Sequence, residues 1–86
     1  MHVRVNVYMD LARKLKWSKR EIAINKDKAT VRDVLNSINE LKDTVLPNLD
    51  SFMVLVNGIN IRLLKGLDTE VGEGFTIDIF PPAGGG

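Results

Sequence analysis

The residue types near the end of the sequence offer one clear opportunity for chemistry. Pro81 and Pro82 are followed by Ala83 and by three consecutive glycines at 84–86, out of only seven glycines in 86 residues. An α-carboxylate at Gly86 would be ionised at neutral pH, since the unperturbed pKa of this group is about 3.3 to 3.7. Such a carboxylate can attack the α-phosphate of ATP, and the acyl-adenylate formed is an electrophile for a sulfur or amine nucleophile. We therefore expect Gly86 to be the reacting residue.

The residues before Gly86 suit a segment that enters a narrow channel in another protein. Prolines fix φ and hold the chain extended, whereas glycines have no Cβ and keep it thin. The six residues after Phe80 can span about 20 Å at roughly 3.3 Å per residue. On this interpretation a partner protein contacts Pro81, Pro82, Gly84 and Gly85. The alternative is an inert terminus, because prolines and glycines are also common where a chain frays.

Composition excludes several other kinds of site. The chain has no cysteine and a single histidine, His2. Disulfides, thiolate metal ligands, thiol nucleophiles, histidine-based metal clusters and Ser-His-Asp triads are therefore excluded. We expect no metal and no bound cofactor, so any sulfur chemistry uses a group other than a side-chain thiol.

Charge and hydropathy argue against nucleic acids and membranes as partners. Twelve basic and eleven acidic side chains give a net charge of +1, without the excess expected of a protein that binds polyanions. Five basic residues between positions 13 and 20 surround Trp17, but one aromatic ring is a poor platform for stacking bases. The longest uncharged run, residues 51–61, is far shorter than the roughly 20 residues that span a bilayer. We expect a cytoplasmic protein.

The two halves of the sequence differ in charge. Residues 43–86 contain two basic and six acidic side chains. Four of these acids, Asp68, Glu70, Glu73 and Asp78, lie in or close in sequence to the last predicted strand. This half would suit a partner that presents arginine and lysine near the tail.

Alternating apolar residues predict the strands that must position the tail. Residues 2–7 alternate strictly, with three valines on one face, and residues 21–24 and 75–79 alternate in the same way. Residues 21–24 are expected to form an edge strand. The last strand should stop at Pro81, because proline cannot donate a hydrogen bond to a neighbouring strand.

A second pair of strands is predicted between these. Residues 52–56 are wholly apolar, which predicts a strand covered on both faces. Asn57-Gly58 is a strong hairpin signal and predicts a short returning strand over residues 59–63. Gly72 and Gly74 predict the turn before the last strand.

One main helix is predicted to begin after Thr30. Thr30 and Asp33 have the spacing of a capping box, with aspartate in place of the usual glutamate or glutamine. Apolar residues then recur at intervals of three and four and give the helix one face to pack on a sheet: Val31, Val34, Leu35, Ile38 and Leu41. A short helix with Asp10 as its cap is predicted over residues 10–15, and Pro47 ends any continuation of the main helix.

This order of elements is that of the ubiquitin-like β-grasp fold. It predicts an α+β protein with a mixed sheet and one main helix packed across one face. Parallel pairing of residues 2–7 with residues 75–79 at the centre would bring both apolar faces against the helix. We expect a β-grasp domain over residues 1–80 and a flexible tail over residues 81–86.

A docking surface is predicted at the root of the tail. Phe80 is in the opposite register from Phe75, Ile77 and Ile79, so its side chain should point away from the helix. Together with Met53 and Leu55 it would form an apolar patch of the kind that binds a partner. In the alternative arrangement, residues 59–71 cover these side chains.

The elements and motifs together resemble the MoaD group of the MoaD/ThiS sulfur carriers, the small subunit of molybdopterin synthase. The resemblance covers the whole chain, and Phe-Pro-Pro shortly before Gly-Gly is its most specific part. The sequence departs from the family pattern in two segments. Where the family has a bulky aliphatic residue followed by Ala or Ser, this chain has Ala83-Gly84. The family's turn Asp-Gly-Asp-Glu is here the segment 71–74, which lacks the second acidic residue. The motifs that carry the resemblance are Thr30-Val31-Arg32-Asp33-Val34-Leu35, Val56-Asn57-Gly58, Phe80-Pro81-Pro82 and Gly85-Gly86.

The resemblance implies a small sulfur carrier that is not catalytic on its own. In this family an E1-like adenylyltransferase uses ATP to adenylate the terminal glycine, here Gly86. A persulfide donor then replaces AMP and leaves a C-terminal thiocarboxylate. The large subunit of molybdopterin synthase receives this sulfur for the dithiolene of the molybdenum or tungsten cofactor.

Two other classes of function are compatible with the same residues. A ubiquitin-like modifier would pass the activated Gly86 to a substrate lysine and form an isopeptide bond. A non-catalytic β-grasp interaction module would leave the tail inert. Sulfur transfer for thiamin synthesis or tRNA thiolation also fits the sequence.

Overall fold

The centre of the structure is a pair of apolar strands that are far apart in the sequence. The computed structural model describes residues 1–82, and within them β1 (His2–Val7) and β7 (Thr76–Phe80) pair in parallel. Val5 lies opposite Ile77, and Val7 lies opposite Ile79. The predicted parallel pairing at the centre of the sheet is therefore confirmed.

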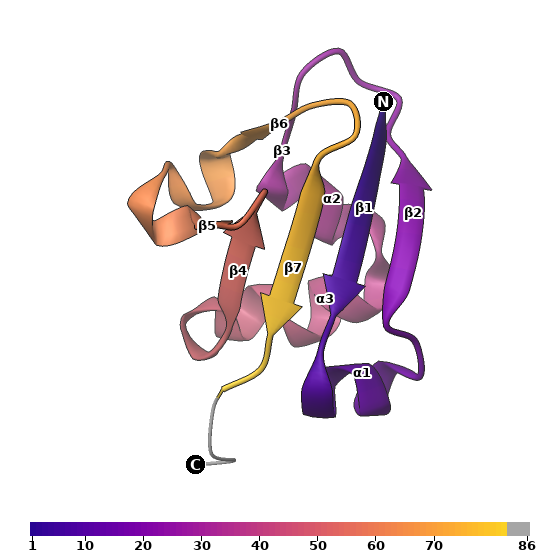
Figure 1. Cartoon of the computed structure of the whole chain (residues 1–86), viewed down its shortest axis with the longest axis vertical. Coiled ribbons are helices and arrows are strands. Elements are labelled where there is room, and N and C mark those ends of the chain that lie inside the picture. Colours follow the sequence, from indigo (N-terminus) through magenta and orange to yellow (C-terminus); the bar gives the residue numbers. More distant parts are fainter. Residues whose placement is uncertain (83–86) are drawn as a thin grey trace.

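Antiparallel strands extend the sheet on both sides. β2 (Lys19–Ala23) pairs with β1, β4 (Met53–Val56) pairs with β7, and β5 (Ile59–Asn60) pairs with β4, so the order is β2-β1-β7-β4-β5 (Figure 1). β2 is an edge strand as predicted, but it begins two residues earlier than the predicted strand. Ile24 lies beyond its end, where its N–H donates to the carbonyl of Met1 at 2.7 Å.

The predicted main helix is interrupted. α2 (Val31–Ser37) and α3 (Asn39–Thr44) are separated by Ile38, whose φ of −115° and ψ of 109° are extended. The Ser37 hydroxyl donates to the carbonyl of Val34 at 2.7 Å, and serine and asparagine make such local bonds at the expense of a continuing helix. The prediction of one continuous helix through Leu41 is wrong for this reason, although both pieces keep their apolar residues on the sheet.

The start of the helical segment is as predicted. The Thr30 hydroxyl accepts from the Asp33 N–H at 3.3 Å, and the Thr30 N–H donates to Asp33 Oδ2 at 2.9 Å. This is a reciprocal capping box. The Thr30 N–H and Lys26 both favour the ionised carboxylate, so the pKa of Asp33 lies below its ordinary value.

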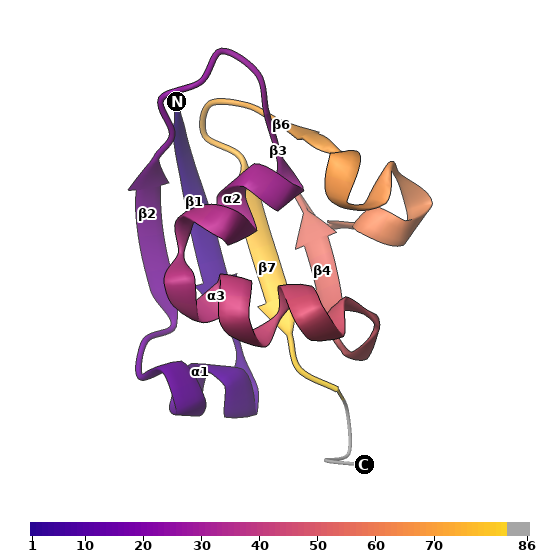
Figure 2. The same ribbon diagram turned by 180° about the vertical axis from the view of Figure 1, so that it is seen from behind.

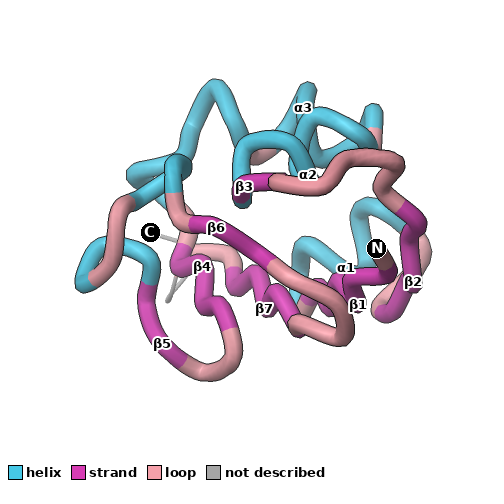
Figure 3. The backbone as a smooth tube through the Cα atoms, turned by 90° about the horizontal axis from the view of Figure 1, so that it is seen from above, coloured by secondary structure: helices cyan, strands magenta, loops and turns pink. Residues whose placement is uncertain are grey.

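All three α-helices leave one face of the sheet open. α2 and α3 cross the back of the sheet, and α1 (Met9–Leu15) lies at the end where β1 stops (Figures 1 and 2). Seen from above, the helices α2 and α3 lie on one side of the strands (Figure 3). The fully buried core lies between these layers and includes Val3, Val5, Leu35, Leu41, Ile77 and Ile79.

The segment after β4 differs from its prediction. The turn at Asn57-Gly58 is confirmed, with φ of 49° and 85°, as a tight hairpin of this type requires. The strand predicted over residues 59–63 is wrong beyond Asn60, because the Asn60 side chain accepts from the Arg62 N–H at 2.9 Å and starts a 3₁₀ turn. The 3₁₀ turns in this part of the chain are η2 (Ile61–Leu63) and η3 (Gly66–Asp68).

The structure differs from the sequence prediction in four further details. β3 (Ala29–Thr30) and β6 (Glu70–Val71) form a separate two-stranded sheet that was not predicted, and the 3₁₀ helix η1 (Leu46–Ser51) precedes β4. The last strand runs over residues 76–80 rather than 75–79. The segment at residues 52–56 is not covered on both faces, because Met53 is 43 % exposed.

The described part of the chain has no helix long and apolar enough to cross a bilayer.

Candidate functional site

The structure brings together the three side chains predicted to form an apolar patch. Phe80 is the last residue of β7, and its register partner on β4 is Met53. Leu55 lies two residues further along β4, opposite Asp78. In a paired sheet these side chains share one face, which here is the open face. Met53 is exposed, and Phe80 and Leu55 are half-buried, so residues 59–71 do not seal this surface.

Tyr8 is a fourth member of this surface that the sequence analysis missed. Its ring stacks on that of Phe80, with centroids 4.2 Å apart and planes 6° from parallel. Its N–H donates to the carbonyl of Ile79 at 3.2 Å, which ties the end of β1 to the end of β7. We call Tyr8, Met53, Leu55 and Phe80 the tail-root face. The parallel pairing was predicted, but its register was not, and the register places the residue that follows β1 beside the last residue of β7.

A small polar network adjoins the tail-root face. Oδ1 of Asp78 accepts from the Tyr8 hydroxyl at 2.7 Å and from Asn6 Nδ2 at 3.0 Å. The hydrogen bond to this carboxylate, partial burial and the nearby negative charge raise the pKa of Tyr8 above its ordinary value. The network therefore holds the Tyr8 ring in place over Phe80 with its hydroxyl protonated.

The two prolines continue from β7 beside α1. Pro81 is half-buried and Pro82 is exposed. With Leu11, Lys14 and Phe52 they line a shallow groove of about 150 Å³. The other predicted tail residues, Gly84, Gly85 and Gly86, lie outside the described residues.

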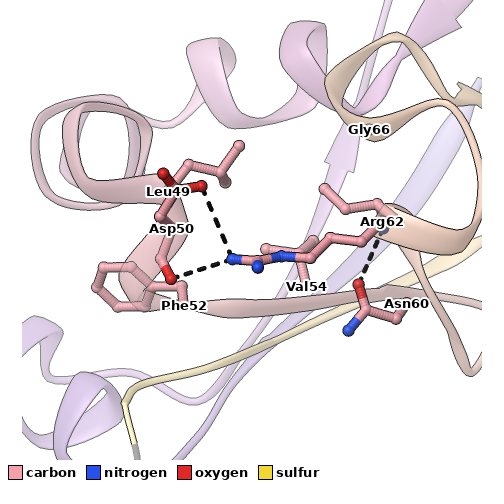
Figure 4. Close-up of a pocket in the computed structure, with 8 residues that line it drawn as sticks. Leu49, Asp50, Phe52, Val54, Asn60, Arg62 and Gly66 are labelled. Carbon is pink, nitrogen blue, oxygen red and sulfur yellow. Dashed lines mark hydrogen bonds and ion pairs between the residues drawn. The ribbon is translucent and has the colours of Figure 1, made fainter.

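A second, small pocket is lined by residues of η1, β4 and η2. Arg62 spans this pocket (Figure 4). Its Nη2 donates to the backbone carbonyl of Asp50 at 3.0 Å and lies 3.8 Å from Oδ1 of the Asp50 carboxylate. The volume of about 80 Å³ corresponds to a few water molecules. Among residues 1–82, no group of three or more histidine, aspartate or glutamate side chains is arranged to hold a metal ion.

The Trp17 ring, the one aromatic group among the basic residues at positions 13–20, is engaged by other side chains of the protein. The Trp17 indole N–H donates to Glu40 Oε2 at 3.1 Å, and the Arg20 guanidinium lies 4.3 Å from the ring centroid. Arg20 also pairs with Glu40 at 3.3 Å. This cluster fastens the loop between α1 and β2 to α3.

The acidic residues that were grouped by sequence are separated in space. Glu70 lies in β6, and Glu73 accepts from the His2 N–H at 2.8 Å at the start of β1. Both are at the end of the sheet opposite Phe80 (Figure 1), and Asp68 is paired with Arg32. Closeness in sequence to the last strand therefore does not bring Asp68, Glu70 and Glu73 near the root of the tail. Of the four acids grouped in this way, Asp78 lies near Phe80, two residues before it on β7.

Fold and site together define a ubiquitin-like β-grasp protein in which a Phe-Pro-Pro segment leaves the central strand. Residues 5–86 match the model of the ThiS family. The chain belongs to this family, whose members include the MoaD-like and ThiS-like sulfur carriers that the sequence motifs indicate.

Solved structures agree with this assignment. The chain is similar to small archaeal modifier protein 1 from Methanosarcina acetivorans, with 25 % identity and a TM-score of 0.77 over 99 % of this chain and 96 % of that chain. It is similar to a chain of the BexX/CysO complex from Amycolatopsis orientalis, with 25 % identity and a TM-score of 0.70 over 98 % and 99 % of the two chains.

A third similar structure is a complex of two subunits. It is that of subunits 1 and 2 of the molybdopterin-converting factor from Helicobacter pylori, with 21 % identity and a TM-score of 0.64 over 100 % of both chains. At this identity the likeness establishes the fold. A search of curated proteins found no match.

Proposed function

We propose that this chain is a sulfur carrier for molybdopterin synthesis that holds its sulfur as a thiocarboxylate at Gly86. The observation that carries the proposal is the position of Phe80-Pro81-Pro82 in a ThiS-family chain. Phe80 ends the central strand and its ring is stacked on Tyr8, and Pro81 and Pro82 follow it directly. No cofactor is needed on the carrier itself, because its partner supplies ATP.

Activation of Gly86 takes three steps. An oxygen of the Gly86 carboxylate attacks the α-phosphorus of ATP, which forms an acyl-adenylate and releases pyrophosphate. The terminal sulfur of a persulfide then attacks the acyl carbon and AMP leaves, which gives an acyl disulfide. A thiol cleaves the sulfur–sulfur bond, becomes part of a new disulfide, and leaves the thiocarboxylate on Gly86.

The donation step returns the carrier to its starting form. The thiocarboxylate sulfur forms a bond to a carbon of the pterin precursor as an oxygen leaving group departs. Water then cleaves the acyl–sulfur bond and regenerates the carboxylate. Two carriers in turn would supply the two sulfur atoms of the dithiolene.

The tail-root face is the surface proposed to dock on the partners. An E1-like adenylyltransferase and the large synthase subunit both need to receive Gly86, so each must come close to Phe80. Aromatic side chains at the centre of an interface commonly contribute a large share of its binding energy. The reaction would take place in the cytoplasm, with a persulfide protein as the sulfur donor.

A second candidate is protein modification. It is favoured by the likeness to small archaeal modifier protein 1, at 25 % identity over nearly the whole chain. In this case the ε-amine of a substrate lysine would displace AMP, or a thiol to which the acyl group had been transferred, and form an isopeptide bond. Both candidates share the adenylation of Gly86.

Adenylation can be tested by pyrophosphate exchange into ATP with the adenylyltransferase of the same organism. The wild-type chain should support exchange, whereas a chain extended by one alanine after Gly86 should not. A chain with an alanine inserted before Met1 is the matched control and should behave like wild type. Exchange supported by the extended chain would refute the assignment of the reaction to Gly86. No exchange with wild type would refute the proposal and leave the inert interaction module as the better account.

A further inference from the structure

Asp78 places a carboxylate in the middle of the open face of the sheet. It lies on the central strand β7, between Asn6 on β1 and Leu55 on β4. It is two residues from Phe80, a separation of about 7 Å along a strand. Its side chain is half-buried and points to the same side as the tail-root face.

Among residues 1–82, no basic side chain forms an ion pair with this carboxylate. Both of its hydrogen bonds come from neutral donors, Tyr8 and Asn6, and both reach Oδ1. On the same face, Arg4 lies opposite Thr76 and Lys19 lies opposite Asn6. None of the ion pairs formed among residues 1–82 includes Asp78.

A partner that receives the tail has to cover Asp78. Stable interfaces bury roughly 800 Å² on each partner, and neighbouring strands are about 4.8 Å apart. An interface centred on Phe80 therefore extends well past the adjacent residues of β7. Removing water from an ionised carboxylate without giving it a counter-charge is strongly unfavourable.

Resting on the proposed function, we infer that the activating enzyme places an arginine or lysine side chain against Asp78. The tail-root face supplies apolar contact, and Asp78 supplies specificity. A partner with an apolar surface at this position would bury an unpaired charge and be rejected, which is a common way to discriminate between partners. The oxygen that faces such a cation is Oδ2, since Tyr8 and Asn6 both hold Oδ1.

The test compares two neutralised variants in binding to the purified adenylyltransferase of the same organism. Asp78→Asn keeps the shape of the side chain and an acceptor for Tyr8 but removes the charge. It should weaken binding about 10- to 100-fold, mainly through faster dissociation, as expected when one partner of a buried charge pair is lost. Glu70→Gln, which removes one exposed charge from β6, is the matched control and should bind like wild type.

The direction in which Asp78→Asn changes binding shows whether the inferred basic contact exists. Unchanged or tighter binding by Asp78→Asn would overturn it, because neutralising an uncompensated charge favours association. Asp78→Thr, a second neutral residue suited to a strand, should weaken binding in the same direction. Thermal melting of each variant shows that the fold is intact.

Failure of the inference can be told apart from failure of the proposed function. Wild-type pyrophosphate exchange together with undiminished binding of Asp78→Asn would overturn only the inferred basic contact. Absence of exchange with wild type would overturn the proposed function, and the inference with it.

Discussion

The ring of Tyr8 lies flat against the ring of Phe80, with 4.2 Å between the centroids. Tyr8 follows the first strand and Phe80 ends the last strand, and the parallel pairing of β1 with β7 brings these two positions to the same edge. The point from which the tail departs is thus held by a residue from the other end of the domain. Asp78 completes the arrangement by accepting the Tyr8 hydroxyl hydrogen bond at 2.7 Å.

Titration of Tyr8 should report this contact directly. It is the single tyrosine of the chain, so tyrosinate absorbance follows this residue alone. The midpoint in the folded protein should lie above the ordinary value of 10.0. Asp78→Asn should move it back toward that value, because the negative charge that opposes ionisation is removed. A wild-type midpoint at or below 10.0 would contradict the contact.

The same shift predicts how stability depends on pH. A pKa that is raised in the folded state means that the folded protein holds its proton more tightly than the unfolded chain. The stabilising contribution of protonated Tyr8 is therefore fully present below pH 10.0 and is lost as the pH rises through the raised pKa. Tyr8→Phe should lack this alkaline loss in denaturation curves measured over the same range.

Phe80→Ala should weaken binding to the activating enzyme by a few kcal/mol if the ring is a central anchor of the interface. Loss of the stack with Tyr8 should lower the free energy of unfolding by only about 1 kcal/mol. Leu63→Ala is a suitable control, because Leu63 is 80 % exposed and lies in η2, away from the tail root. A large loss of stability with unchanged affinity would assign Phe80 to the core instead.

Thr30→Ala should lower the free energy of unfolding by about 1 kcal/mol, because it removes the side-chain half of the capping box. Asp33 forms the other half, and its pKa is lowered from 3.8 in the folded state. Its contribution is thus present above pH 3.8 and is lost as the pH falls through the lowered pKa. Urea denaturation of wild type and Asp33→Asn should give a stability difference that shrinks in acid, and a difference independent of pH would argue against the cap.

Charge reversal at Glu70 should have little effect on the rate of association with the activating enzyme. The sequence order alone predicted that acids such as Asp68 and Glu70 steer a basic partner to the tail. The five residues of β7 alone separate the two ends of the sheet by about 14 Å, beyond the Debye length of about 8 Å at physiological ionic strength. Stopped-flow mixing of Glu70→Lys at two salt concentrations checks this, and a marked, salt-dependent slowing would restore the steering account.

The parts of the fold predicted correctly are those written in local patterns. Val3, Val5 and Val7 alternate on one face, and Asn57-Gly58 adopts the positive φ angles that its turn requires. The break at Ile38 was missed because its neighbours still follow a helical apolar spacing. The pairing of β3 with β6 was missed because two residues are too few to show alternation.

Part of the candidate site could likewise be predicted from local patterns, and part could not. Phe80, Met53 and Leu55 could be placed on one face from strand alternation alone. The contacts of Tyr8 and Asn6 with Asp78 join residues some 70 positions apart, and they depend on the register between β1 and β7. Alternation gives the face of a side chain but not its register, so this polar network became visible only in the structure.

The central claim is that Gly86 carries sulfur, and the mass of the native protein tests it most directly. The protein should be purified under thiol-free conditions from the organism that produces it, and its intact mass should be measured. Its C-terminal peptide should then be sequenced by mass spectrometry. We predict a fraction of molecules in which one oxygen of the Gly86 carboxylate is replaced by sulfur, and loss of this fraction when the adenylyltransferase gene is deleted. Finding only the carboxylate in cells that are actively making the cofactor, or finding the same sulfur-containing fraction without the adenylyltransferase, would contradict the account.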